Sequence, residues 1–138
     1  MSYYDFEQHE AFCERGKDLV SSGCYEEALA CYEQAIVLAP NHHITWILRG
    51  GVLTHLDRYS EAKNSFEQAL KIQPDDKDAW LFFGVALQQL GQYKKAYAAF
   101  DEALGTKQRS LWKKLTQVFK KRVYGITCVL FDAQKVGL

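Results

Sequence analysis

The chain has 138 residues, enough for one domain with a buried core, and its 48% hydrophobic and 25% charged residues are typical of a globular protein. Seventeen basic and seventeen acidic residues cancel, which argues against a nucleic-acid partner. No stretch approaches the ~20 apolar residues of a membrane-spanning helix, and the acidic N-terminus does not resemble a secretory signal, so we expect a cytoplasmic protein.

The four cysteines, Cys13, Cys24, Cys31 and Cys128, form no C-x-x-C pair. The first three fall within helical patterns, where a thiol behaves as a small apolar side chain. We therefore expect free, reduced thiols rather than disulfides or a zinc site.

Residues 1–8 carry no clear start signal for a helix and are expected to be a frayed N-terminal lead-in. From His9 the apolar residues follow a helical period until Ser22-Gly23 interrupts it, and a second helix is predicted from about Tyr25 to Leu38. Pro40 ends that helix, because proline lacks an N–H and disfavours helical backbone in the residue before it.

The same plan follows twice more along the chain. Helices are predicted at about 44–56 and 59–72, then at about 78–90 and 93–104, and Pro74 and Gly105 mark the ends of these two pairs. Gln108 stands where the third pair would have its proline.

Matching residues recur at an offset of 34: Trp46 matches Trp80, Gly50 matches Gly84, and Phe66 matches Phe100, while the first unit follows more loosely with Phe12, Gly16 and Tyr32. Gly50 and its equivalents are expected to lie opposite Ala62 and its equivalents, so that small residues on both sides let the helices of a pair approach closely. One pair cannot bury both of its apolar faces, so about three stacked pairs are needed for stability.

These residues resemble the tetratricopeptide repeat, in which Trp, Leu-Gly and Tyr are followed by Ala, an aromatic residue and a terminal Pro. The second unit matches at Trp46, Gly50, Leu53, Ala62, Phe66 and Pro74, with Arg49 in the place of a Leu. The resemblance covers three repeats, residues 9–42, 43–76 and 77–108. It implies an all-α fold, a right-handed α-solenoid of three helix-turn-helix hairpins.

The segment 107–122 contains seven basic residues and no acidic one. On a helix, one face would be apolar and the opposite face would carry lysines; the apolar residues are Leu111, Trp112, Leu115, Val118, Phe119 and Val123. Repeat families commonly end in a helix that covers the last repeat, so residues 109–138 are expected to form an amphipathic capping helix and a tail. The apolar run 126–131 is compatible with an extension of this cap or with pairing to another copy.

Candidate catalytic residues are not apparent. The sequence has no nucleophile motif and no phosphate-binding loop, and His42 and His43 lie at an inter-repeat turn with no carboxylate or Cys at ligand spacing. We expect no catalytic, metal or cofactor site, and therefore no enzyme.

The resemblance implies instead that the first helix of each pair lines a concave groove that holds a peptide. Carried over by repeat position, the partner-binding residues would be Cys13, Lys17, Ile44, Ile47, Leu48, Gly51, Asp78, Leu81, Phe82 and Val85. Ile47, Leu48, Leu81 and Phe82 would form an apolar strip across neighbouring first helices. Glu14 and Asp78 would flank this strip, which favours a ligand that is apolar at its centre and basic at one end.

Some members of the family grip the C-terminal carboxylate of heat-shock chaperones with a clamp of Lys, Asn and Arg side chains. The corresponding positions here are Cys13, Lys17, Leu48, Asp78 and Phe82, and none carries the expected residue. Asp78 would repel a carboxylate, so a chaperone cofactor of that kind is not expected.

The sequence therefore predicts a protein–protein interaction scaffold or adaptor that binds an apolar peptide or helix of a protein partner. One alternative is self-association, as a homo-oligomer, through the C-terminal helix. Another is an anionic-surface binder, for nucleic acid or lipid, that uses the basic helix. Because a basic amphipathic stretch that packs on a repeat stack is more often a cap, this last alternative ranks lowest.

Overall fold

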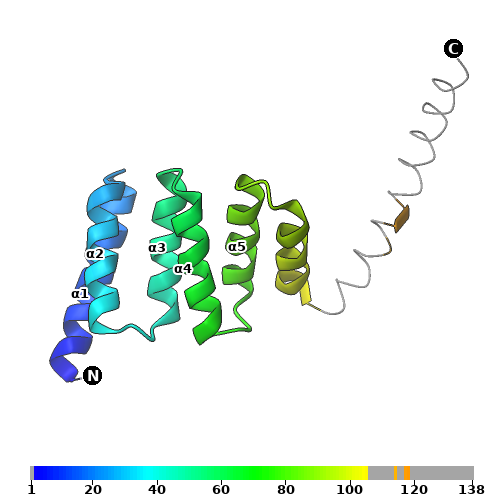
Figure 1. Ribbon diagram of the computed structural model, residues 1–138. Helices are drawn as coiled ribbons and strands as arrows, with labels where there is room; N and C mark the ends of the chain where they lie inside the picture. Colours follow the sequence, from blue (N-terminus) through cyan, green and yellow to red (C-terminus); the bar gives the residue numbers. More distant parts are fainter. Residues whose placement is uncertain (1, 106–113, 115–116, 119–138) are drawn as a thin grey trace, which may run out of the picture. The chain divides into compact units, whose positions relative to one another are not determined.

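The computed structural model describes residues 2–105, 114 and 117–118 (Figure 1). Residues 2–105 form helices joined by short turns, with no strand among them. The helices are α1 (Tyr3–Ser21), α2 (Tyr25–Leu38), α3 (His43–His55), α4 (Tyr59–Ile72), α5 (Lys77–Gln89) and a sixth helix that covers residues 93–105. The predicted all-α fold of three helical hairpins is confirmed.

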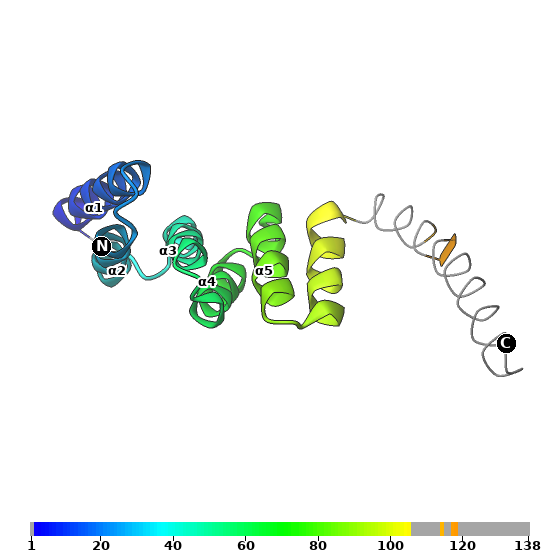
Figure 2. The same ribbon diagram turned by 90° about the horizontal axis from the view of Figure 1, so that it is seen from above.

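The helices pair as the repeat predicts. Helix α1 packs on α2 and α3 packs on α4, and the contacts of α2 with α3 and of α4 with α5 join each hairpin to the next. Seen from above, α1 and α3 lie in one layer and α2 and α4 in the other (Figure 2). This two-layer stack belongs to the first of the chain's two compact units, Met1–Ala103; the second is Leu104–Leu138.

The turns inside the three hairpins share one backbone conformation. Gly23, Asp57 and Gly91 are 34 residues apart, and their φ angles are 77°, 58° and 74°. This left-handed region suits glycine, and aspartate is one of the few other residues that adopt it readily. The carboxylate of Asp57 also accepts a hydrogen bond of 2.7 Å from the Tyr59 hydroxyl, which holds the turn at the one repeat that lacks the glycine.

The turns between hairpins are closed by tryptophan. The indole N–H of Trp46 donates to the carbonyl of Pro40 at 2.8 Å, and that of Trp80 donates to the carbonyl of Pro74 at 2.7 Å. Each bond ties the loop after one hairpin to the first helix of the next. The recurring Pro therefore ends a helix and the recurring Trp fills apolar space, and the two residues also form a hydrogen bond with each other.

The start of α1 differs from the prediction. The expectation that residues 1–8 form a frayed lead-in is wrong, because the helix begins at Tyr3. Ser2 and Asp5 form a capping box: the Asp5 amide donates to the Ser2 hydroxyl oxygen at 3.2 Å, and the Ser2 amide donates to the Asp5 carboxylate at 3.1 Å. This pair satisfies amides that a helix start leaves without partners, and it adds nearly two turns to α1.

The close approach within each hairpin also differs from the expected glycine–alanine contact. The atoms nearest to a Cβ at Gly16, Gly50 and Gly84 belong to the rings of Tyr32, Phe66 and Phe100. The helix surface at each glycine is a shallow site that an aromatic ring of the second helix fills. Ala28, Ala62 and Ala96 are also fully buried, where they pack among the core residues.

Three thiols are described, and all are free: Cys13 and Cys31 are buried and Cys24 is half-buried. Cys128 lies outside the described residues, as does nearly all of the expected capping segment 109–138. No helix in the described part of the chain is long and apolar enough to cross a membrane.

Candidate functional site

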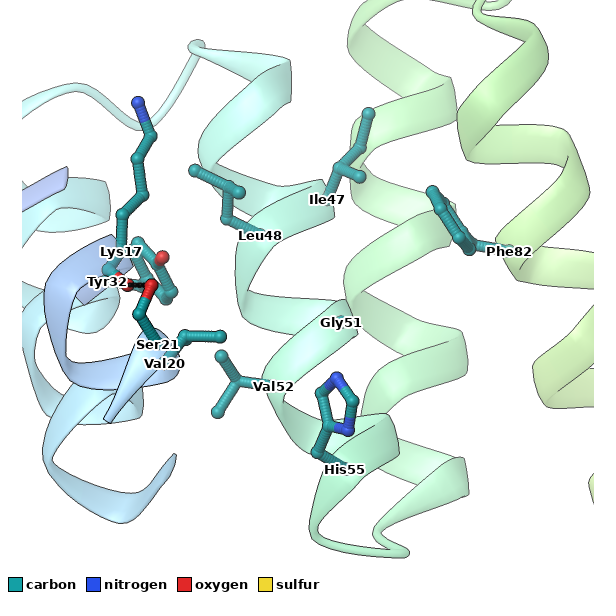
Figure 3. Close-up of a pocket in the computed structure, with 10 residues that line it drawn as sticks. All are labelled: Lys17, Val20, Ser21, Tyr32, Ile47, Leu48, Gly51, Val52, His55 and Phe82. Carbon is teal, nitrogen blue, oxygen red and sulfur yellow. Dashed lines mark hydrogen bonds between the residues drawn. The ribbon is translucent and has the colours of Figure 1, made fainter. Parts of the chain in front are cut away.

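Two neighbouring clefts lie on the face formed by the first helices of the repeats. The first, of about 380 Å³, is cleft A (Figure 3). Ile47 and Leu48 enter it from α3, Phe82 enters from α5, and Lys17 borders it from α1. His55 and Gly51, also on α3, form its far side. The lining is therefore mainly apolar, with one cation at the edge.

The second cleft, cleft B, has a volume of about 420 Å³ and lies between α1 and the start of α3. Phe6, Glu10 and Glu14 border it from α1, and Ile44 borders it from α3. Lys17 and Leu48 line both clefts, so the two clefts adjoin, and we call them together the groove.

Seven of the ten predicted partner-binding residues line the groove: Cys13, Lys17, Ile44, Ile47, Leu48, Gly51 and Phe82. The other three, Asp78, Leu81 and Val85, belong to α5 and line neither cleft. Asp78 and Leu81 are exposed, whereas Val85 is half-buried. A role in binding stays a prediction for all ten residues.

Apolar side chains remain open to solvent beside the clefts. Ile44, Leu81 and Phe82 expose 47%, 45% and 44% of their surfaces. Phe82 is supported from below, because its ring stacks on the buried Phe66 at a centroid distance of 5.9 Å. The ring of Phe82 therefore packs on the core and is still exposed enough to contact a ligand.

Acidic side chains dominate the α1 border. Glu14 accepts a hydrogen bond of 2.7 Å from Lys17, and this ion pair neutralises the cation that lies between the two clefts. Glu10 and Asp78 are exposed and take part in no ion pair within the described chain. The groove therefore combines an apolar floor with a net negative rim.

A polar cluster that the sequence analysis missed lies beneath cleft B. The Oγ1 atom of the fully buried Thr45 lies 3.0 Å from Nε2 of His9 and 2.9 Å from Nδ1 of His42. The Sγ atom of Cys13 lies 3.8 Å from the same oxygen. Cys13 is thus largely a partner of this cluster and contributes little open surface to the groove.

The hydrogen-bond directions within the cluster are restricted. Thr45 has one hydroxyl hydrogen, so it donates to one imidazole and the other imidazole donates to it. Nδ1 of His9 is buried without a partner, and protonation would place an unsatisfied N–H there. Burial lowers the pKa of His9 and that of His42, and for His42 the neighbouring His9 and His43 lower it further. These surroundings therefore favour the neutral form of both rings.

A second missed contact involves Arg49, which occupies the Leu place of the repeat. Its guanidinium donates to the buried Ser65 hydroxyl at 2.6 Å and to the Glu33 carboxylate at 3.1 Å. The side chain therefore joins α3 to α4 and to α2 of the preceding hairpin. Within the described residues, no group of three His, Cys, Asp or Glu side chains is arranged to hold a metal ion.

Phe6 lines cleft B but is not among the ten predicted residues, although the sequence contains a signal that places it there. The Ser2-x-x-Asp5 pattern is a capping box, and it starts the helix early enough to include Phe6. Phe6 then precedes Glu10, Cys13 and Lys17 at spacings of four, seven and eleven, which share one face of a helix.

Two sequence models described as tetratricopeptide repeat match this chain, one over residues 19–82 and the other over residues 53–118. The matches overlap and together span most of the sequence. The chain belongs to the tetratricopeptide repeat family. A search of curated proteins gave no significant match.

Solved tetratricopeptide repeat (TPR) domains have the same fold. The second TPR of Spaghetti (RPAP3), solved bound to the HSP90 peptide SRMEEVD, is 25% identical, with a TM-score of 0.69 over 70% of this chain and 90% of that one. The Arabidopsis OM64 TPR domain is 24% identical, with a TM-score of 0.71 over 80% and 94%. The TPR2B domain of yeast Sti1, solved as a complex with pHsp70, is 20% identical, with a TM-score of 0.69 over 86% and 98%.

Proposed function

We propose that this TPR protein is a protein-interaction module whose groove binds an apolar peptide or helix. The observation that carries the proposal is the exposure of Ile44 in cleft B and of Phe82 in cleft A, 47% and 44%, together with the 45% exposure of Leu81 next to Phe82 on α5. Exposed apolar side chains that cluster around a cleft usually indicate a binding surface, whereas scattered exposed apolar residues do not. The peptide-bound TPR domain of Spaghetti supports binding of a short segment by this fold.

The chemistry of the groove favours a ligand different from the chaperone peptide SRMEEVD. That peptide ends in acidic residues and a carboxylate, whereas the groove here has Glu10, Glu14 and Asp78 around it. Lys17, the one lysine or arginine that lines the clefts in the described part of the chain, is already paired with Glu14. We therefore expect a ligand with an apolar centre and basic flanks.

The affinity should be modest. Removing the strip from water stabilises a complex by roughly 25 cal/mol per Å² of apolar surface. The ordering of a flexible peptide offsets much of this gain, so dissociation constants on the order of micromolar are expected.

A displayed peptide library selected on the full chain would test the proposal. Enriched peptides should contain apolar residues flanked by Lys or Arg. They should bind the wild type and lose at least ~10-fold in affinity on Phe82→Glu in cleft A and on Ile44→Glu in cleft B. Val37→Glu is the matched control, because Val37 lies on α2 away from the clefts and is 76% exposed.

The outcome that contradicts the proposal is equally clear. If the selected peptides bind Phe82→Glu and Ile44→Glu as tightly as the wild type, the groove is not the binding surface. Circular dichroism and thermal melts of each variant must match the wild type. A variant that unfolds is replaced by Phe82→Gln or Ile44→Gln, which change the polarity of the same side chain without adding charge.

A further inference from the structure

Resting on the proposed function, we propose that the ligand of the groove is residues 107–122 of a second copy of this chain. Two observations meet in this inference: the groove has an apolar floor with an acidic rim, and this segment has apolar and basic residues in helical register. The exchange of this segment between two copies would make the protein a homodimer.

The charges of the chain are strongly separated. Residues 107–122 hold seven of the seventeen basic residues and none of the seventeen acidic ones, while the whole chain is neutral. All residues outside this segment therefore sum to a net charge of −7. A protein with this division attracts the basic segment of another copy to its acidic part, which raises the rate of encounter and fixes orientation.

The acidic groups are placed where such a segment would need them. Glu10 and Glu14 border cleft B, and Asp78 is exposed on α5 four residues before Phe82, which lines cleft A. Among the described residues, Lys17 is the one lysine or arginine that lines either cleft, and it is paired with Glu14. Basic residues at both ends of the segment, such as Lys107 and Arg122, would thus meet acid on either side of the strip.

The apolar sides also correspond. Lys114, Gln117 and Val118 are helical, and Val118 exposes 57% of its surface. By sequence spacing, Leu111, Leu115 and Phe119 would share one face with Val118 on a helix. A helix laid in a groove presents anchors at spacings of three, four and seven, which this set provides. The exposed Ile44, Leu81 and Phe82 offer apolar surface to such a helix.

A second copy is the occupant that uses both surfaces of the chain at once. In a two-fold dimer each copy gives its segment to the groove of the partner, so one association event forms two identical interfaces. The second contact is then made at a high effective concentration, and two micromolar contacts produce a dimer more stable than either contact alone.

The oligomeric state of the full chain tests the inference. Sedimentation equilibrium in ~0.05 M salt should show a dimer that dissociates on dilution. The dissociation constant should rise at least ~10-fold in ~0.5 M salt, because screening weakens the rim contacts. Phe82→Glu should abolish the dimer, and Val37→Glu should leave it intact. A chain that is monomeric at every concentration in low salt would overturn the inference.

Charge exchange identifies the two surfaces. A groove variant, Glu10→Lys with Glu14→Lys, and a segment variant, Lys113→Glu, Lys114→Glu, Lys120→Glu and Lys121→Glu, should each be monomeric. A mixture of the two should form a heterodimer, because the acidic segment now meets a basic groove. A mixture that stays monomeric, or a groove variant that still dimerises, would contradict the inference. Glu27→Lys with Asp75→Lys, two exposed acids outside the clefts, is the matched control and should dimerise.

A labelled peptide of residues 107–122 separates this inference from the proposed function. Peptides selected from the library that bind the groove while the 107–122 peptide does not compete with them would leave the proposed function standing and refute the inference. Competition by the 107–122 peptide, weakened at least ~10-fold by Phe82→Glu, supports both.

Discussion

The Cβ that an alanine would carry at position 50 falls 2.5 Å from Cε1 of Phe66, well inside the contact distance of two carbon atoms. The same relationship joins Gly16 to Tyr32 and Gly84 to Phe100. Each ring is held by the core, so it cannot move aside without opening a gap elsewhere. The aromatic ring sixteen positions later therefore leaves room only for a glycine at this place in the repeat.

We expect Gly50→Ala to destabilise the fold by about 1–3 kcal/mol, the usual effect of overpacking a filled core. Gly51→Ala is the matched control in the same helix, because nothing lies within 4 Å of a Cβ there. That change should stabilise α3 by about 0.5–1 kcal/mol, since alanine has the higher helix propensity. Urea unfolding monitored by circular dichroism measures both. Equal effects of the two substitutions would show that the ring of Phe66 moves easily.

The Arg49 contact predicts strong coupling between two substitutions. Arg49→Leu restores the residue type of the repeat but leaves the buried Ser65 hydroxyl without its 2.6 Å donor, which should cost about 1–3 kcal/mol. Arg49→Leu combined with Ser65→Ala should cost less than Arg49→Leu alone, because no orphaned hydroxyl remains. Free energies of unfolding for the two single variants and the double variant give the coupling. Strict additivity would mean that the two side chains act independently.

The His9–Thr45–His42 cluster predicts that stability falls at mildly acidic pH. Burial lowers the pKa of both histidines below the unfolded value of about 6.5, so the unfolded chain binds protons first as the pH falls. The stability present above about pH 6.5 is therefore lost progressively below it. Glu10 acts in the opposite direction on both rings, but desolvation is the larger effect.

Urea midpoints at about pH 7.5 and about pH 5.5 measure this loss. His9→Gln should reduce the difference between the two midpoints, because glutamine can contact Thr45 but does not titrate. His55→Gln, outside the cluster, is the control and should leave the difference unchanged. A wild-type protein with the same midpoint at both pH values would show that the cluster accepts a proton without strain.

The thiols should differ in reactivity. Cys24 is half-buried, whereas Cys13 and Cys31 are buried, and burial raises the pKa of Cys13, so that less of it is thiolate at neutral pH. In a Cys128→Ser background, alkylation followed by mass spectrometry should label Cys24 first and Cys13 and Cys31 only on opening of α1 or α2. Labelling of Cys13 at the rate of Cys24 would indicate that cleft B is open to solvent down to Thr45.

Much of the fold could be predicted from the sequence because turn residues and prolines mark the ends of the helices. The predicted bounds of α2 and α4 agree with the structure, since a turn residue before each helix and Pro40 or Pro74 after it mark both ends. Helical period and the offset of 34 then place side chains on faces. The start of α1 was missed because its signal, Ser2 with Asp5, is a side-chain exchange rather than an apolar period.

Contacts across helices were harder to predict. Periodicity shows that Gly50 and Phe66 both face inward, but it cannot show that the ring, and not Ala62, meets the glycine. The bond of His9 to Thr45 spans 36 residues and that of Arg49 to Ser65 spans 16, and no local pattern marks either. These polar contacts depend on how the helices pack within a hairpin and between hairpins, which only the folded chain defines.

The Trp–Pro hydrogen bond also indicates how far along the sequence the regular junction between hairpins extends. It closes both junctions between complete hairpins, Trp46 to Pro40 and Trp80 to Pro74. One repeat further on, the sequence has Lys114 and Gln108 at these two places, so the same bond cannot form. The sequence therefore provides this junction contact twice and not a third time. Grafting Pro and Trp at 108 and 114 would be the first step in lengthening the superhelix by one more unit.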